Sequence, residues 1–289
     1  MTPRIDAHQH FWRIGRGDYG WLTADKPALF RDFGPEDLRP LLDRNGIGGT
    51  ILVQAAPTEA ETAFLLGIAA EEPRVLGVVG WTEFTDPRAA DRIAALAGDT
   101  LLVGLRPMVQ DIAEDDWLLR PELDAAFRAV TELGLVFDAL VLPRHLRRLE
   151  QVVAAHPALS VVIDHGAKPE IRDRAWQPWA DDIARLARYP NTRCKISGLV
   201  TEAAADWRPD DLRRYVEHLR EHFGADRLLW GSDWPVVTNA ASYDRWCEVT
   251  LQLTEDWGEA ERAALLGGTA SRTYLTRRGR APEGGRPRC

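Results

Sequence analysis

The feature of this sequence that most constrains its fold is a regular alternation of short apolar runs with longer amphipathic stretches. The apolar runs predict eight strands, at residues 5–10, 49–54, 75–81, 101–106, 135–140, 160–165, 193–197 and 227–233. Most are continuous apolar segments, which is typical of parallel strands buried on both faces. The chain of 289 residues is long enough for eight such strand–helix units. The sequence therefore predicts an α/β fold, a (β/α)8 or TIM barrel.

The amphipathic stretches supply the helices that this fold requires. They predict helices at residues 35–45, 59–72, 86–97, 121–133, 143–155, 176–189, 209–223, 242–256 and 259–266. Asp86 is expected to cap the third helix, with Pro87 in its first turn, and Gly134 is expected to end the fourth. Nearly every predicted strand is thus followed by a helix.

An open, doubly wound sheet is the alternative arrangement for the same alternation. Its phosphate-binding loop is missing, because residues 15–20 match the spacing G-x-G-x-x-G but no helical pattern opens after them. No shift in composition and no internal repeat divides the chain. We therefore predict one domain at 1–276 and a flexible tail, basic and rich in Gly and Pro, at 277–289.

Composition and charge exclude several classes of protein. The net charge of −8 argues against nucleic acid or an anionic membrane surface as the partner. No apolar run approaches the roughly 20 residues that span a bilayer, and the first strand begins too early for a signal peptide. Cys194, Cys247 and Cys289 lie far apart, so we expect reduced thiols in a cytoplasmic protein. The oligomeric state is not predicted.

Polar and titratable side chains stand at the ends of most predicted strands. They are His8, His10, Gln54, Trp81, Arg106, Asp138, Asp164, His165, Lys195, Ser197 and Asp233. Along a strand, Asp6, His8 and His10 are expected to share one face. Buried charge is costly unless it is paired, so a barrel without a function has no reason to gather these groups at one rim. The pattern therefore predicts an active site at the C-terminal ends of the strands.

Several motifs at these strand ends form a specific combination. They are IDAHQHFW at 5–12, DYGWL at 18–22, VGLRPMVQD at 103–111, DHGAKP at 164–169, CKISGL at 194–199, GSDWP at 231–235 and LLGGTAS at 265–271. In this combination the chain resembles the amidohydrolase superfamily, in the branch with L-fuconolactonase, L-rhamnonolactonase, sulfomuconolactone hydrolase and 2-pyrone-4,6-dicarboxylate lactonase. The resemblance covers roughly residues 4–275. It implies an amidohydrolase-type barrel whose substrate is a small-molecule lactone.

The resemblance also bears on metal binding. No Lys or Glu stands at the fourth or fifth strand end, where two-metal members carry a bridging ligand, so at most one divalent ion is expected. Its ligands would be His8, His10, His165 and Asp233, a set that suits Zn²⁺ with an open position for water. Some members of this branch hydrolyse lactones without a metal, so the resemblance leaves the requirement for a metal open.

Lactone hydrolysis assigns roles to the residues at the rim. Asp233 is expected to take the proton of the attacking water, with His8, His10 and His165, or a metal that they hold, orienting the water or polarising the carbonyl. Arg106 and Lys195 would bind the substrate together with Asp138, or they would form rim salt bridges to Asp138 and Asp164. Trp21, Trp81 and Trp234 would stack on a sugar ring or anchor loops. Asp6, one step deeper, would support the histidines.

Four functions compete for this site. The first is a hydrolase of sugar-acid lactones such as L-fuconolactone, and the second is a hydrolase of aromatic-breakdown lactones such as sulfomuconolactone or a pyrone dicarboxylate. The third is a metal-dependent decarboxylase of the same superfamily, and the fourth is a binding protein without activity. The H-x-x-E-H spacing at 218–222 offers a separate metal site, but it lies on the amphipathic helix predicted at 209–223, which belongs to the outer ring.

Overall fold

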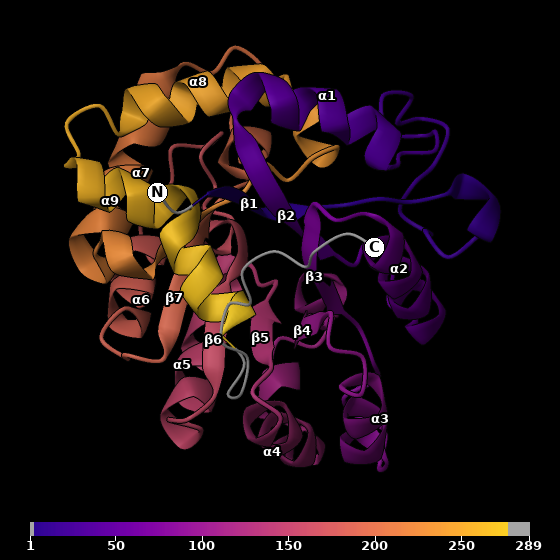
Figure 1. The fold of residues 1–289 in the computed structure, drawn as a ribbon. Helices are drawn as coiled ribbons and strands as arrows, with labels where there is room; N and C mark the ends of the chain where they lie inside the picture. The colour runs from indigo at the N-terminus through magenta and orange to yellow at the C-terminus, as the bar shows by residue number, and fades with distance from the viewer. Residues whose placement is uncertain (1–2, 277–289) are drawn as a thin grey trace.

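Eight parallel strands form a barrel in the computed structural model, which describes residues 3–276 (Figure 1). The strands follow the chain order, each pairing with the next. They are β1 Arg4–Gln9, β2 Ile47–Val53, β3 Val75–Gly80, β4 Leu102–Leu105, β5 Val136–Ala139, β6 Ser160–Ile163, β7 Thr192–Ile196 and β8 Leu228–Trp230. A parallel bridge between Gln9 and Trp234 brings the first and last strands together. The predicted TIM barrel is confirmed.

Helices surround the strands, as the ribbon in Figure 1 shows. They are α1 Pro35–Asn45, α2 Glu59–Glu71, α3 Ala89–Leu96, α4 Asp124–Glu132, α5 Leu146–Ala155, α6 Trp179–Leu186, α7 Pro209–Phe223, α8 Tyr243–Leu253 and α9 Glu259–Ala263. The predicted bounds of α1 and α7 are correct at both ends, because Pro stands in the first turn and a Gly follows the last residue of each. Short 3₁₀ turns, Pro121–Leu123 and Pro143–His145, precede α4 and α5.

The predicted start of α3 is wrong. Asp86 does not cap this helix, which begins three residues later with Arg88 at the N-cap position. The Asp86 carboxylate instead accepts a hydrogen bond from the backbone N–H of Arg88 at 2.7 Å and from the Arg92 side chain at 3.0 Å. A short polar side chain that bonds the backbone two residues on favours a turn over the first turn of a helix.

The last helix also differs from its prediction. α9 ends at Ala263, and two π-helical segments, Ala264–Gly268 and Ser271–Leu275, continue the chain. The first contacts β1 and β8, and the second contacts β3 and β4. Gly267 permits this close packing, because a Cβ atom at this position would overlap the carbonyl oxygen of Pro3. The C-terminal segment therefore packs against the start of the barrel strands.

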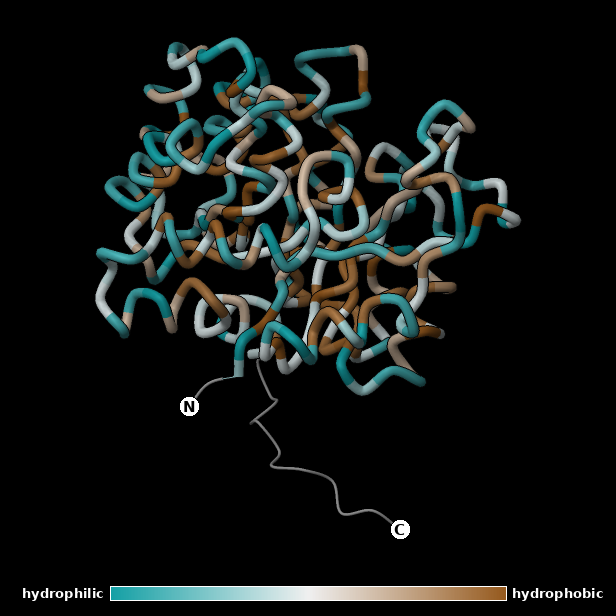
Figure 2. The backbone as a smooth tube through the Cα atoms, turned by 90° about the horizontal axis from the view of Figure 1, so that it is seen from above, coloured by the Kyte–Doolittle hydropathy of each residue, from teal (hydrophilic) through white to brown (hydrophobic). Residues whose placement is uncertain are grey.

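Two apolar clusters account for the core. The larger cluster lies between the strands and the surrounding helices. The smaller one lies inside the barrel and consists of Ile5, Ala7, Ile51, Val53, Val79, Val103, Val136, Val162, Leu229, Ala270 and Tyr274. Figure 2 shows hydrophobic stretches toward the middle of the molecule and hydrophilic ones on the outer turns. Burial of apolar surface in both clusters stabilises the barrel.

Four further expectations concern the chain as a whole. In residues 3–276, no helix is long and apolar enough to cross a membrane. Cys194 and Cys247 are free thiols, the first buried and the second half-buried. The tail predicted at 277–289, with Cys289, lies outside the described residues. The cytoplasmic location stays a prediction.

Candidate active site

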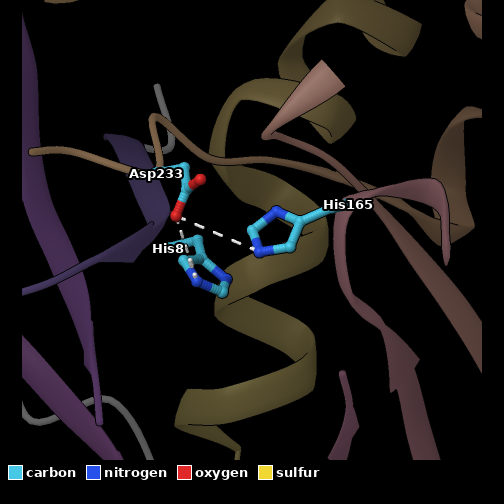
Figure 3. Close-up of side chains that lie close together, drawn as sticks. All are labelled: His8, His165 and Asp233. Carbon is cyan, nitrogen blue, oxygen red and sulfur yellow. Dashed lines mark ion pairs between the residues drawn. The ribbon is translucent and has the colours of Figure 1, made fainter. Parts of the chain in front are cut away.

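Side chains from three distant parts of the sequence meet at the C-terminal rim of the barrel. His8 comes from β1, His165 follows β6 and Asp233 follows β8 (Figure 3). The Asp233 Oδ1 atom lies 3.7 Å from His8 Nε2 and 4.0 Å from His165 Nε2. His10 Nε2 joins them, 3.2 Å from both Asp233 Oδ1 and His8 Nε2. The structure thus brings together all four residues of the predicted metal-binding set.

The backbone conformation at this rim is unusual. His165 and Asp233 have φ angles of 54° and 58°, in the left-handed region that residues with a Cβ atom rarely adopt. Such conformations cost on the order of 1–3 kcal/mol each and cluster at functional sites. The surrounding contacts hold them: the Asp233 backbone N–H donates to His8 O at 2.8 Å, and His165 Nδ1 lies 2.8 Å from Ser197 Oγ. The strained turns after β6 and β8 therefore direct the side chains of His165 and Asp233 toward each other.

The expectation that Asp6 shares a face with His8 is wrong. Asp6 Oδ2 accepts a hydrogen bond from the hydroxyl of Tyr243, which lies on α8 outside the barrel, whereas Ile5 and Ala7 belong to the cluster inside it. The pairing of β1 with β2 shifts register between Asp6 and Gln9, which breaks the simple alternation. Asp6 still supports the site, because its Oδ1 accepts the backbone N–H groups of His8 at 3.1 Å and Ser232 at 2.8 Å.

Burial sets the protonation of the imidazoles. Burial, together with the nearby Lys195 ammonium, lowers the pKa of His8 well below its usual value. Burial also lowers the pKa of His165 to about 4, although Asp233 opposes the shift. Burial alone would raise the pKa of Asp233, but the attraction of His165 and a hydrogen bond from His10 outweigh it, so that pKa lies below its usual range. Near neutral pH, His8 and His165 are uncharged beside a carboxylate.

The donor set fits a single divalent ion. His10 Nδ1–H donates to the carbonyl of Val53 at 2.8 Å, which holds the ring so that Nε2 faces His8 and Asp233. The Nε2 atoms of His8 and His10 and the Oδ1 atom of Asp233 lie 3.2–3.7 Å from one another. At these distances a proton or a metal ion must lie between them. Ligand atoms that are each about 2.0–2.1 Å from one zinc ion lie about 3.3 Å apart in a tetrahedron. His8, His165 and Asp233 offer ligand atoms that all lie within 4.8 Å of one another.

Arg106 lies beside this group at the end of β4. Its guanidinium donates to the backbone carbonyl of Gln54 and, at 3.0 Å, to the Gln54 side chain. A second nitrogen lies 3.4 Å from both His8 Nε2 and Asp164 Oδ2. The side chain is only 3% exposed, but it lines a cavity at the rim, which is described below. The structure therefore holds a fixed cation at the wall of the site.

Lys195 and Asp138 lie deeper and do not line the rim cavity. The Lys195 ammonium, fully buried, pairs with Asp138 at 2.5 Å and Asp164 at 2.9 Å, and lies 3.3 Å from His8 Nδ1. Burial opposes the charged ammonium, but the two carboxylates outweigh it and raise the pKa of Lys195. Burial raises the pKa of Asp138 to about 6. Both side chains therefore lie beneath His8. They form an ion pair, which was the predicted alternative to binding the substrate.

Tyr274, which had no predicted role, completes this buried network. Its hydroxyl donates to the Asp138 carboxylate at 2.8 and 2.9 Å, from the C-terminal π-helical segment on the opposite side of the barrel. A tyrosine near a chain end gives no sign in the sequence that it reaches the centre of the fold. Only its place just after the motif at 265–271 could have drawn attention to it.

A cavity of about 290 Å³ opens above Asp233, and we call it the first cavity. Of the predicted site residues, His10, Trp21, Arg106, His165 and Asp233 line it. Other lining residues were not given a role from sequence: Lys26, Ala55, Met108, Gln110, Asp111, Leu140 and Val236. Met108, Gln110 and Asp111 belong to the motif at 103–111, which was the available signal. Trp21, whose indole N–H donates to Ala55 O at 2.7 Å, forms one wall.

The other two predicted tryptophans lie elsewhere. Trp81 lines a second cavity of about 730 Å³, next to the first. Trp234 is 3% exposed and packs edge-to-face on Phe11 and Phe33 with ring centroids 6.1 and 5.2 Å away. Its packing is that of a loop anchor, which was one of the two alternatives for this residue.

The H-x-x-E-H residues lie on α7, as predicted. His218, Glu221 and His222 are close enough together to hold an ion. However, His218 Nε2–H donates to Ala180 O at 2.8 Å, and its ring packs against Trp176 and Trp179 with centroids 4.9 and 5.4 Å away. These contacts account for His218 as a packing residue between α6 and α7.

Comparisons with known proteins agree with this geometry. The family described as Amidohydrolase matches residues 5–275. The chain is 44% identical to an L-fucono-1,5-lactonase of Burkholderia ambifaria, over 95% of this chain and 96% of that protein. A second L-fucono-1,5-lactonase, of Burkholderia multivorans, is 42% identical over 94% and 95% of the two chains. A crystal structure of an amidohydrolase from Burkholderia multivorans with bound zinc is 38% identical and superposes with a TM-score of 0.90, covering 95% of this chain and 99% of that one.

Proposed function

The chain belongs to the amidohydrolase family, and from this premise we propose that it is a lactonase. Its substrate is a small sugar-acid lactone of the kind represented by L-fucono-1,5-lactone, and its reaction is opening of the ring ester by water. The relatives named for that activity cover nearly the whole chain at 44% and 42% identity. Relatives with one fold diverge in substrate mainly through their loops, so the substrate is the first property to test.

One observation carries the proposal: the Asp233 carboxylate stands at the wall of a cavity, surrounded by three imidazoles within 4.0 Å. A carboxylate so placed is a base for a water molecule in the cavity. The Arg106 guanidinium lines the same cavity and is a donor for a developing negative charge on the carbonyl oxygen. The cavity thus holds both a base and a cation for the reaction.

The residues of this chain account for each proton in the reaction. The water oxygen attacks the lactone carbonyl carbon while Asp233 takes one water proton, and Arg106 stabilises the oxyanion. Collapse of the tetrahedral intermediate breaks the bond between the carbonyl carbon and the ring oxygen. Asp233 then returns its proton to the leaving alkoxide, so that the carboxylate is regenerated and the product is a hydroxy acid. His165 and His10 border the cavity and fix the orientation of the water.

His8, His10, His165 and Asp233 would hold one divalent ion, with zinc as the expected metal. When bound, such an ion would supply Lewis-acid polarisation of the lactone carbonyl. Two features support this proposal: the convergence of neutral imidazoles on a carboxylate, and the bound zinc in a structure that is 38% identical to this chain. The charges of the buried network also favour a cation, because Arg106 and Lys195 pair with Asp138 and Asp164, which leaves the carboxylate of Asp233 facing imidazoles.

A second candidate function is hydrolysis of a lactone that carries carboxylates, such as a pyrone dicarboxylate. The observation in its favour is that Lys26, Arg106 and Lys168 all line the first cavity. Lys168 is paired with Glu202 at 3.3 Å, and Asp111 adds a negative charge to the lining, which favours the less charged sugar lactone.

The test is lactone hydrolysis, followed by proton release, on a panel of aldonolactones with 2-pyrone-4,6-dicarboxylate beside them. Each substrate is assayed with and without a chelator, and metal content is measured separately. We expect turnover of L-fucono-1,5-lactone or a close neighbour. Activity that the chelator abolishes and Zn²⁺ restores would support the metal, and activity that survives in metal-free protein would exclude a required one. Turnover of the dicarboxylate alone would favour the second candidate, and turnover of no lactone would exclude both.

A further inference from the structure

The second cavity lies between the loops that follow β1, β3 and β4. It shares Trp21, Met108 and Asp111 with the first cavity, so the two cavities adjoin along a common wall. Its volume of about 730 Å³ is more than twice the 290 Å³ of the first cavity. A single lactone ring held at Asp233 in the first cavity leaves the adjoining second cavity empty, and a larger substrate could reach it.

The walls of the second cavity combine flat apolar surfaces with free polar groups. Trp21, Trp81 and Trp117 supply aromatic rings, and Met108 and Ile112 add apolar surface. The indole N–H groups of Trp81 and Trp117 make no hydrogen bond to any residue in 3–276, whereas that of Trp21 is used by Ala55 O. The cavity thus offers aromatic faces and unused donors side by side.

Carboxylates surround these rings. Glu83, Asp111 and Glu114 are exposed and line the second cavity, with Asp18. Arg120 is the basic side chain of the lining, and it already pairs with Glu114 at 2.9 Å. Arg16 offsets Asp18 from outside the lining, at 2.6 Å. The net charge of the lining is therefore negative, which repels an anionic ligand. The second oxygen of each of these carboxylates can still accept a hydrogen bond from a neutral ligand.

Apolar faces with hydroxyl groups at the edge are the surface of a neutral sugar ring. Its C–H face would stack on a tryptophan, and its hydroxyl groups would donate to the carboxylates and accept from the indole N–H groups. We propose that the second cavity is a subsite for a neutral glycosyl group attached to the lactone that is opened in the first cavity. The inference rests on the proposed lactonase function and adds to it a substrate class, namely aldonolactones that carry a sugar substituent.

Kinetics test this subsite directly. The substrates are a disaccharide aldonolactone, with a neutral hexosyl substituent, and the corresponding monosaccharide lactone. In the unchanged enzyme we expect kcat/KM to be at least about tenfold higher for the disaccharide lactone, since an aromatic stacking contact and a few hydrogen bonds supply that much binding. Trp81→Ala should remove most of this ratio. Trp207→Ala is the matched control, because Trp207 is also half-buried but lies outside both cavities.

Binding without turnover provides a second readout. Isothermal titration calorimetry compares a methyl hexopyranoside with a hexuronate of the same ring. We expect the neutral glycoside to bind more tightly by about tenfold and Trp81→Ala to weaken it, because the acidic lining repels the uronate. Equal binding of the two ligands, or binding that Trp81→Ala leaves unchanged, would overturn the inference.

The two failures are distinguishable. If simple lactones are opened but the ratio of the two kcat/KM values is near one, the subsite is wrong and the lactonase function stands. If Trp207→Ala changes the ratio as much as Trp81→Ala does, the effect is a general disturbance and the subsite is again wrong. If no lactone is opened, both the proposed function and this substrate class fail, whatever the calorimetry shows.

Discussion

The two halves of the barrel interior differ in chemistry although the same strands build both. On β5, Val136 belongs to the apolar cluster and Asp138, two residues further on, pairs with Lys195. On the sixth strand and its end, Val162 and Asp164 repeat the pattern. Side chains two residues apart lie on one face of a strand, so the interior changes from apolar to ionic within one layer of side chains.

This difference separates stability from function. The apolar half gains free energy from burial, and the C-terminal segment covers it with Ala270 and Tyr274. Burying the charged groups of the ionic half costs desolvation free energy, and their ion pairs offset this cost only in part. A barrel has no structural need for the ionic half, so its presence at the rim end indicates a site. Tyr274 connects the halves, because its ring lies in the apolar cluster and its hydroxyl reaches Asp138.

The largest expected effect comes from changing the proposed base, Asp233, in the ionic half. We expect Asp233→Asn to lower kcat/KM for the lactone by about 10²–10⁴-fold, because an amide cannot take the proton of water. The free energy of unfolding should change far less than the activity does. Kinetics and denaturant unfolding measure the two effects.

Asp182→Asn is the matched control for this change. Asp182 lies on α6, away from the rim. Its carboxylate is also buried, but it pairs with Arg147 at 2.7 Å. The Asp182→Asn variant should keep an activity close to that of the unchanged enzyme. An equal loss of activity in both variants, or full activity in Asp233→Asn, would contradict the role of Asp233.

The next change is made in the apolar half. Ile51 is fully buried inside the barrel, so Ile51→Ala should lower the free energy of unfolding by about 2–5 kcal/mol through lost burial and the cavity it leaves. The kcat of the folded fraction should stay near its original value. Leu251→Ala on α8 is the control, because Leu251 is 42% exposed and should lose little stability. Loss of kcat without loss of stability would show that the two halves are not separable in this way.

The smallest expected effect is at the residue that links the halves. Tyr274→Phe removes the hydroxyl that donates to Asp138, which should cost about 1.5–3 kcal/mol of stability near neutral pH. Burial raises the pKa of Asp138 to about 6, and the Tyr274 hydrogen bond opposes that rise by favouring the charged form. Losing the bond raises this pKa further. The loss of stability should therefore be largest above pH 7 and should shrink toward pH 5, where Asp138 becomes protonated in both proteins.

Thermal unfolding at several pH values measures this effect. Tyr215→Phe is the control, because the Tyr215 hydroxyl donates to a backbone carbonyl, Ala175 O, at 2.9 Å instead of to a carboxylate. Its loss of stability should not depend on pH in this range. If both variants show the same pH dependence, the link between Tyr274 and the charge of Asp138 is wrong.

Much of the rim site followed from strand direction alone. The ends of parallel strands meet at one edge, so His8, Arg106, Asp164, His165 and Asp233 could be placed at the same rim from the sequence. The details that failed depend on local competition. The register shift in β1 after Asp6 put Asp6 and His8 on different faces, and the hydrogen bond from Arg88 N to Asp86 delayed the start of α3. Both are effects of a few hydrogen bonds that residue patterns do not reveal.

The sequence was enough to predict the eight strand–helix units, the end of the barrel that carries the candidate site and the residues available there. These follow from apolar periodicity and chain direction, which are local properties. Only the tertiary structure decided which of these residues meet: Lys195 with Asp138 beneath the site, Trp81 in a second cavity and Tyr274 from the far end of the chain. Those contacts span many residues in sequence, and they depend on how closure of the barrel sets the height and direction of each side chain.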